Sequence, residues 1–178
     1  MNYELDIKKE LRASMNGILS ARMREAGMPF KLIFGVELPR LQSIAEEFPK
    51  DTELAHKLWS QNIRETRLLA IMLMPTEAFT PKEANTWAET MQTAEEAQVT
   101  AMILLSKTNQ AKEICMNWLE KKEALPSICA CHALRRLLVQ GIELNADEKC
   151  IVEEWMNEME SNANLHLRKA IQALKDAL

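Results

Sequence analysis

Two residue types recur along this chain at nearly the same interval, between 28 and 37 residues. One is tryptophan, found at Trp59, Trp87, Trp118 and Trp155. The other is an alanine followed by bulky aliphatic residues, found at Ala70, Ala101, Ala133 and Ala170. A period of this length is typical of helical repeats, in which each helix pair must stack on the next to bury its apolar face. We therefore predict an all-α fold, an α-α superhelix of HEAT-like or armadillo type made of stacked antiparallel helix pairs, with these residues at packing positions.

Apolar residues at helical spacing, together with proline, glycine and capping residues, predict where the helices begin and end. An opening helix is expected over 3–26, an irregular connector over 28–36 and a short helix over 39–48. Eight more helices form four hairpins, at 51–61 with 64–74, 81–90 with 94–105, 109–121 with 125–140, and 146–160 with 165–178. We expect a single domain over 1–178, with N-terminal helices over 1–50 and the four hairpins over 51–178.

Composition agrees with this fold and excludes several classes of protein. Valine, tyrosine and glycine, which favour strands and tight turns, number only four, one and four. The longest apolar run, Leu68–Met74, has seven residues, whereas a helix needs about 20 to span a bilayer. The formal net charge of −4 gives no general attraction to DNA, so a nucleic-acid surface would have to be local. The N-terminal residues do not form a signal peptide and the four cysteines do not form a disulfide framework, so we expect a cytoplasmic protein with reduced thiols.

No residue cluster predicts a metal or a cofactor. Cys129, Cys131 and His132 form a CxCH sequence, but two helical residues two positions apart point about 200° away from each other. Buried thiols are therefore the simpler interpretation. His56 and His166 have no cysteine or aspartate at ligand spacing, and the four glycines do not form a phosphate-binding loop.

Two pairs of basic residues are the best candidates for a nucleic-acid contact. Arg135 and Arg136 lie on the second helix of one predicted pair, and Arg168 and Lys169 on the second helix of the next. If those second helices line one side of the array, the four cations form a local stripe that could bind duplex DNA. The alternative is that they are ordinary exposed or interhelical charges.

Several stretches resemble a known family. These are FGVELPRLQSIAEEFPKD at 34–51, ELAHKLWSQNIRETRLLAIMLMP at 53–75, LLSKTNQAKEICMNWLE at 104–120 and, more faintly, LRKAIQAL at 167–174. They are similar to the AlkD-like DNA alkylation repair family, whose members are helical-repeat glycosylases that remove alkylated purines. The resemblance implies that the concave face of the array holds DNA, that tryptophans flank the lesion, and that one aspartate assists cleavage of the glycosidic bond.

The residues that this resemblance assigns to the active site are absent here. With the match at 106–108 as the register, the family's W-D-x-x-D motif falls on 94–98, where Ala94 replaces the tryptophan and Gln98 the catalytic aspartate. The family's paired arginine falls on Pro126-Ser127-Ile128, and its final tryptophan and arginine fall on Ala173 and Asp176.

This loss favours binding over catalysis. Glutamine has no charge to stabilise the oxocarbenium character that develops as the base leaves, and alanine has no π face for a cationic nucleotide. Glu95 or Glu96 is the remaining candidate for the missing carboxylate, although both project away from position 98 on a helix. We therefore expect a non-catalytic relative that binds nucleic acid or protein, with an active DNA glycosylase for alkylated purines as the alternative. The oligomeric state is left open.

Overall fold

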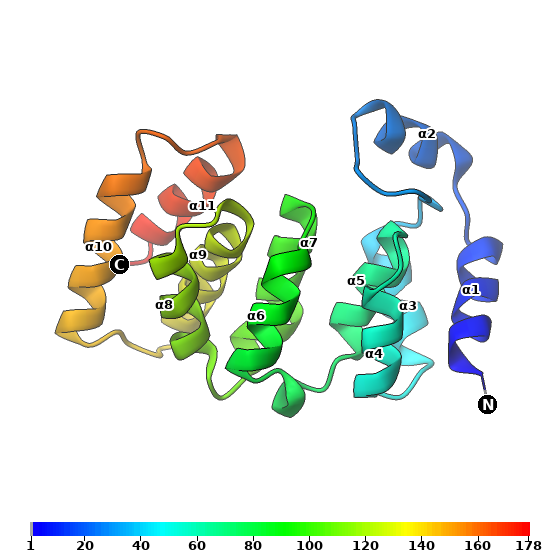
Figure 1. Cartoon of the computed structure of the whole chain (residues 1–178), viewed down its shortest axis with the longest axis horizontal. Helices are drawn as coiled ribbons and strands as arrows, with labels where there is room; N and C mark the ends of the chain where they lie inside the picture. The colour runs from blue at the N-terminus through cyan, green and yellow to red at the C-terminus, as the bar shows by residue number, and fades with distance from the viewer. Residues whose placement is uncertain (1) are drawn as a thin grey trace. The chain divides into compact units, whose positions relative to one another are not determined.

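The computed structural model describes residues 2–178, and every regular element in that range is helical (Figure 1). The chain divides into two compact units, one ending at Ala78 and the other beginning at Phe79. Each unit is described by itself, and the expectation of a single domain stays a prediction. Within residues 2–178, no helix has the length and apolar character needed to cross a bilayer.

The first unit consists of five α-helices and a short 3₁₀ turn. They are α1 (Tyr3–Ala13), α2 (Gly17–Glu25), α3 (Leu38–Glu46), α4 (Thr52–Trp59), α5 (Arg64–Leu73) and the turn at Thr76–Ala78. Helix α5 packs against both α3 and α4, and α1 packs against α4. Every residue of α5 is buried, so its polar first turn must find partners inside the unit.

The single opening helix expected over 3–26 is wrong, because two helices, α1 and α2, occupy this segment. Asn16 separates them: its side chain accepts a hydrogen bond from Leu19 N at 3.0 Å and so caps α2. Its own N–H donates to the Phe34 carbonyl at 3.0 Å. A helix that continued through residue 16 would lose both bonds, and the second depends on a residue far away in the sequence.

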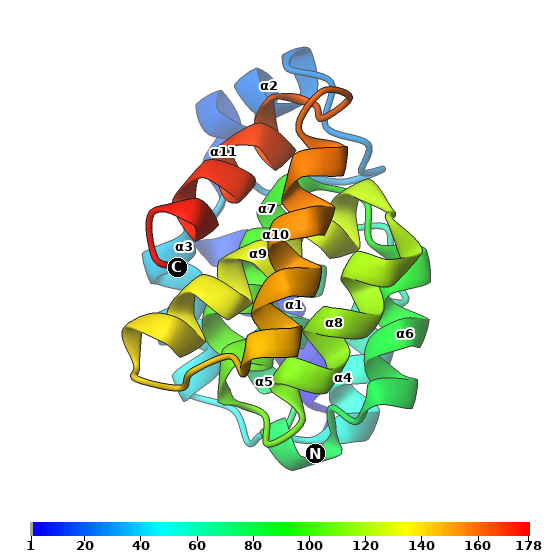
Figure 2. The same ribbon diagram turned by 90° about the vertical axis from the view of Figure 1, so that its left-hand side faces the viewer.

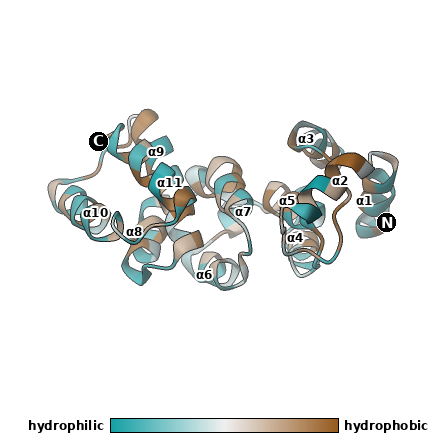
Figure 3. Ribbon diagram, turned by 90° about the horizontal axis from the view of Figure 1, so that it is seen from above, coloured by the Kyte–Doolittle hydropathy of each residue, from teal (hydrophilic) through white to brown (hydrophobic). Residues whose placement is uncertain are grey.

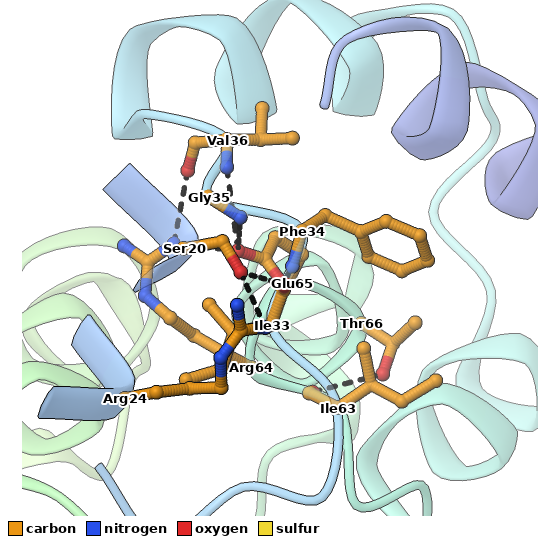
Figure 4. Close-up of polar contacts among 10 residues, drawn as sticks. All are labelled: Ser20, Arg24, Ile33, Phe34, Gly35, Val36, Ile63, Arg64, Glu65 and Thr66. Atoms are coloured by element: carbon orange, nitrogen blue, oxygen red, sulfur yellow. Dashed lines mark hydrogen bonds and ion pairs between the residues drawn. The ribbon is translucent and has the colours of Figure 1, made fainter. Parts of the chain in front are cut away.

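The connector over 28–36 is held by a buried carboxylate (Figure 4). Glu65, which is 0% exposed, accepts hydrogen bonds from three successive backbone N–H groups, those of Phe34 at 2.9 Å, Gly35 at 3.0 Å and Val36 at 3.3 Å. The Arg64 guanidinium donates to Glu65 at 2.9 Å and to the Val36 carbonyl at 2.9 Å. These bonds, which we call the Glu65 clasp, satisfy the polar groups of an irregular segment that has no helix of its own.

The clasped segment in turn holds α2 (Figure 4). Ser20, the one buried residue of α2, donates to the Ile33 carbonyl at 2.6 Å and accepts from Arg24 at 2.9 Å. Gly35 has φ +75°, and a Cβ built on it would lie 2.3 Å from Asn16 O and 2.7 Å from Ser20 N. Only glycine allows the two backbones to approach this closely.

The second unit contains the remaining helices. They are α6 (Pro81–Thr90), α7 (Ala94–Val99), a π-helix (Thr100–Leu104), a 3₁₀ turn (Leu105–Lys107), α8 (Ala111–Lys121), α9 (Ala124–Val139), α10 (Ala146–Met159) and α11 (Leu165–Lys175). First helices pack on first helices, α6 on α8 and α8 on α10, while second helices pack on second helices, α7 on α9 and α9 on α11. Figures 1 and 2 show α9 beside α11 and α8 beside α10. This two-layer arrangement is the repeat that the sequence period predicts.

The tryptophans and alanines that mark the repeat are packing residues, as predicted. The four tryptophans are between 0% and 6% exposed, and all four alanines are 0% exposed. In the second unit, Trp118 donates from Nε1 to Asn85 Oδ1 at 3.1 Å, and Trp87 meets Phe79 edge to face with 5.5 Å between ring centroids. In the first unit, the Arg67 guanidinium lies 3.8 Å from the centroid of Trp59.

The helix expected over 94–105 is not regular. Its α-helical part ends at Val99 and continues as the π-helix and the 3₁₀ turn. Thr100, Ala101 and Leu104 are buried in this wider turn, which packs against α9. Hydrophobic spacing does not distinguish an α from a π turn, because the same residues are buried in both.

Candidate nucleic-acid interface

Charge is distributed unevenly among the helices of the second unit. Helices α9 and α11 contain no aspartate or glutamate within their bounds, whereas α10 contains five carboxylates and one lysine. The hydrophilic character of α10 is visible in Figure 3. The formal net charge of the whole chain is −4, whereas α9 and α11 carry basic residues and no carboxylate within their bounds. The two helices pack side by side.

The four cations predicted from the sequence lie on this pair of helices. Arg135, Arg168 and Lys169 are exposed and Arg136 is partly exposed. Within residues 2–178, none of these four side chains makes a hydrogen bond or an ion pair. Lys175, farther along α11, differs because it is paired with Glu160 at 2.7 Å. We call Arg135, Arg136, Arg168 and Lys169 the basic stripe, and its binding role stays a prediction.

His132 lies one helical turn before Arg135 and Arg136 on α9. Its ring is half-buried, and Nε2 is enclosed without a hydrogen-bond partner in the described chain. Burial, and then the two guanidinium groups, lower the pKa of His132 below its usual value. The imidazole is therefore neutral at pH 7. Residue spacing alone does not distinguish His132 from the cysteines of the CxCH cluster.

The thiols of that cluster are core residues. Cys129 and Cys131 are 0% exposed, and burial raises the pKa of Cys131 to about 12. Burial also raises the pKa of Cys129 and of Cys115 on α8, so all three stay protonated at neutral pH. No group of three or more potential metal ligands occurs in the part of the chain that the structure describes.

The residues that the resemblance aligns with the family's W-D-x-x-D motif make contacts of their own. Glu96 is 0% exposed, and its carboxylate accepts from Gln92 N at 2.6 Å, while Thr93 Oγ1 accepts from Glu96 N at 3.2 Å. These bonds form the polar start of α7, and the Glu96 carboxylate is buried inside the unit. Gln98 is exposed and uncharged, and Ala94 is partly exposed.

The positions that the resemblance aligns with the family's arginines also carry other residues. Ser127 is 0% exposed and its hydroxyl has no partner among the described residues, and Pro126 beside it is also buried. Asp176 accepts from Gln172 at 2.7 Å. Where the resemblance implies cations, the chain therefore has buried small residues and a carboxylate.

The second unit has no exposed aromatic side chain for stacking on a base. Its aromatic residues are Phe79, Trp87, Trp118 and Trp155, all between 0% and 4% exposed. Base stacking requires an accessible ring face. The aromatic side chains of this unit therefore offer no platform for base stacking, whereas exposed arginines and lysines are the residue types that contact phosphates.

Comparisons with known proteins support the fold and identify the family. A solved structure described as "A new family of proteins related to the HEAT-like repeat DNA glycosylases with affinity for branched DNA structures" superposes with a TM-score of 0.81, covering 99% of this chain and 75% of that chain. The sequence identity is 16%, so the likeness establishes the fold, a HEAT-like α-α superhelix. No curated protein matches the sequence significantly.

The family model for DNA alkylation repair enzymes matches residues 7–172, which is nearly the whole chain. The resemblance found in four stretches of sequence is thus confirmed over both compact units. The chain belongs to the DNA alkylation repair enzyme family.

Proposed function

We propose that this chain is a non-catalytic member of its family that binds DNA through the phosphate backbone, using the basic stripe. The observation that carries the proposal is the pair of adjacent helices, α9 and α11, with four unpaired cations and no carboxylate. Phosphates attract such a surface whatever the base sequence, since neutralising them releases condensed counterions. We also propose that the protein acts in the cytoplasm, where its buried thiols stay reduced.

Two further observations support this proposal. The structural neighbour is described as having affinity for branched DNA structures, which supports a DNA-binding role for this fold. The positions aligned with the family's tryptophan and aspartate are Ala94 and Gln98, and Glu96 is occupied in capping α7. A fold that presents four unpaired cations on two adjacent helices, and has no tryptophan or aspartate at the aligned positions, is suited to binding.

Reversing two charges of the stripe is expected to weaken binding strongly. With Arg135→Glu and Arg136→Glu together, affinity for a labelled duplex and for a four-way junction should fall roughly tenfold or more at low salt, because two attractions become repulsions. With glutamine at both positions, the slope of log affinity against log salt should become less steep by about 2, one for each lost phosphate contact. Fluorescence anisotropy measures both quantities.

The matched control changes net charge equally on the other layer. Lys82→Glu with Lys149→Glu alters exposed lysines on the first helices α6 and α10, and it should leave affinity nearly unchanged. Equal losses in the two double variants would mean that only total charge matters. An unaltered affinity in the Arg135/Arg136 variant would show that the stripe is not the contact surface.

The absence of a catalytic carboxylate predicts no base excision. Purified protein incubated with duplex DNA containing 7-methylguanine or 3-methyladenine should release no base above a protein-free control, because no charge is fixed at position 98 to stabilise the oxocarbenium character. Chromatography of the released bases measures this. Release that disappears in Glu95→Gln would instead establish the alternative, an active glycosylase with a displaced carboxylate.

A further inference from the structure

His132 has an unusual position beside the basic stripe. It is three and four residues before Arg135 and Arg136, so on α9 all three side chains share one side of the helix. Its Nε2 is enclosed without a hydrogen-bond partner among residues 2–178, and a proton added to the ring would place a cation next to two guanidinium groups that are themselves unpaired in that range.

Among the described residues, the buried faces that pack against α9 carry few ionisable groups. The packed helices turn apolar faces toward α9: the buried residues of α11 are Leu167, Ala170, Ile171 and Leu174. The buried titratable groups on α7, α8 and α9 are Glu96, whose carboxylate is bound to the Gln92 N–H, and the protonated thiols Cys115, Cys129 and Cys131. Burial and then, among the described charged side chains, Arg135 and Arg136 lower the pKa of the imidazole.

We propose that His132 takes up a proton when phosphate groups bind at Arg135 and Arg136, so that acidification tightens the binding of DNA by this surface. The inference rests on the proposed function, because DNA must occupy the stripe. A bound phosphate neutralises the guanidinium groups and removes their repulsion of an imidazolium. By linkage, a ligand that favours the protonated ring is itself favoured by protonation.

The expected effect follows from the size of the change in proton affinity. Each unit by which DNA raises the pKa of His132 adds up to about tenfold in affinity once the pH is below both values. Lowering the pH from 7.5 to 5.5 should therefore strengthen DNA binding by the unaltered protein about three- to tenfold more than binding by His132→Asn. His56→Asn, which removes an exposed imidazole from α4, should behave like the unaltered protein.

The ring itself can be followed by NMR without relying on affinity. In the free protein, Arg135→Gln with Arg136→Gln should raise the pKa of His132, and a saturating duplex should raise it in the unaltered protein. Acid stability must be checked by circular dichroism, since a histidine whose pKa is lowered by folding destabilises the fold as the pH falls below its unfolded value.

The outcomes separate this inference from the proposed function. Loss of the extra pH dependence in His132→Asn alone, with a DNA-induced rise in the His132 pKa, supports the inference. DNA that binds while the His132 pKa stays fixed overturns it and leaves the proposed function standing. If neither the duplex nor the junction binds at any pH, both fail together.

Discussion

Replacing Glu65 with alanine is expected to lower the free energy of unfolding by about 3–5 kcal/mol. The carboxylate is 0% exposed and accepts from three backbone N–H groups as well as from Arg64, whose side chain is only 3% exposed. Its removal leaves those donors and a guanidinium charge inside the unit without their acceptor. Urea unfolding followed by circular dichroism measures the change.

A carboxylate in an exposed ion pair provides the control. Glu53 pairs with Lys57 at 2.6 Å, but its side chain is 78% exposed, and Glu53→Ala should leave the unfolding midpoint almost unchanged because water screens the pair. Glu65→Gln tests the charge separately, since the amide keeps one acceptor oxygen but turns a donor toward the backbone N–H groups. Equal midpoints for Glu65→Ala and Glu53→Ala would mean that the clasp contributes nothing to stability.

Replacing Gly35 with alanine is expected to destabilise the first unit by about 2–4 kcal/mol. Alanine at φ +75° is strained by itself, and its Cβ would lie 2.3 Å from Asn16 O and 2.7 Å from Ser20 N. Both contacts are with backbone atoms, so α2 must move away and lose the Ser20 bond to the Ile33 carbonyl. Hydrogen exchange should show faster exchange of the α2 amides, and chemical denaturation gives the loss of stability.

Gly27→Ala separates the cost of the positive φ angle from the cost of the close backbone contacts. Gly27 has φ +81°, but nothing lies within 4 Å of the added Cβ, so this change should cost only about 1 kcal/mol for the backbone conformation. If both alanine variants lose the same stability, the close approach at Gly35 is not what holds α2.

The helices of the second unit could be predicted from sequence because each carries an apolar face at helical spacing and ends at a cap. Helix α6 has the predicted bounds, α10 ends one residue earlier than predicted, and α9 both begins and ends one residue earlier. The predicted helix bounds are wrong where a contact with a residue distant in the sequence determines the local structure. Asn16 ends one helix and starts another because its N–H meets the Phe34 carbonyl, and the π turn at Thr100–Leu104 forms in a segment that packs against α9.

The candidate site also combines features that the sequence predicts with features that depend on tertiary packing. The sequence by itself determined the α class, the repeat period, the family and the absence of an aspartate at position 98, because residue identity and spacing carry that information. Only the tertiary structure decided that the two basic pairs lie on helices packed side by side, that Glu96 points inward to cap α7, and that the Glu65 carboxylate holds a segment some thirty residues away in sequence. Burial and hydrogen bonding between distant residues arise from packing, which spacing along the chain does not record.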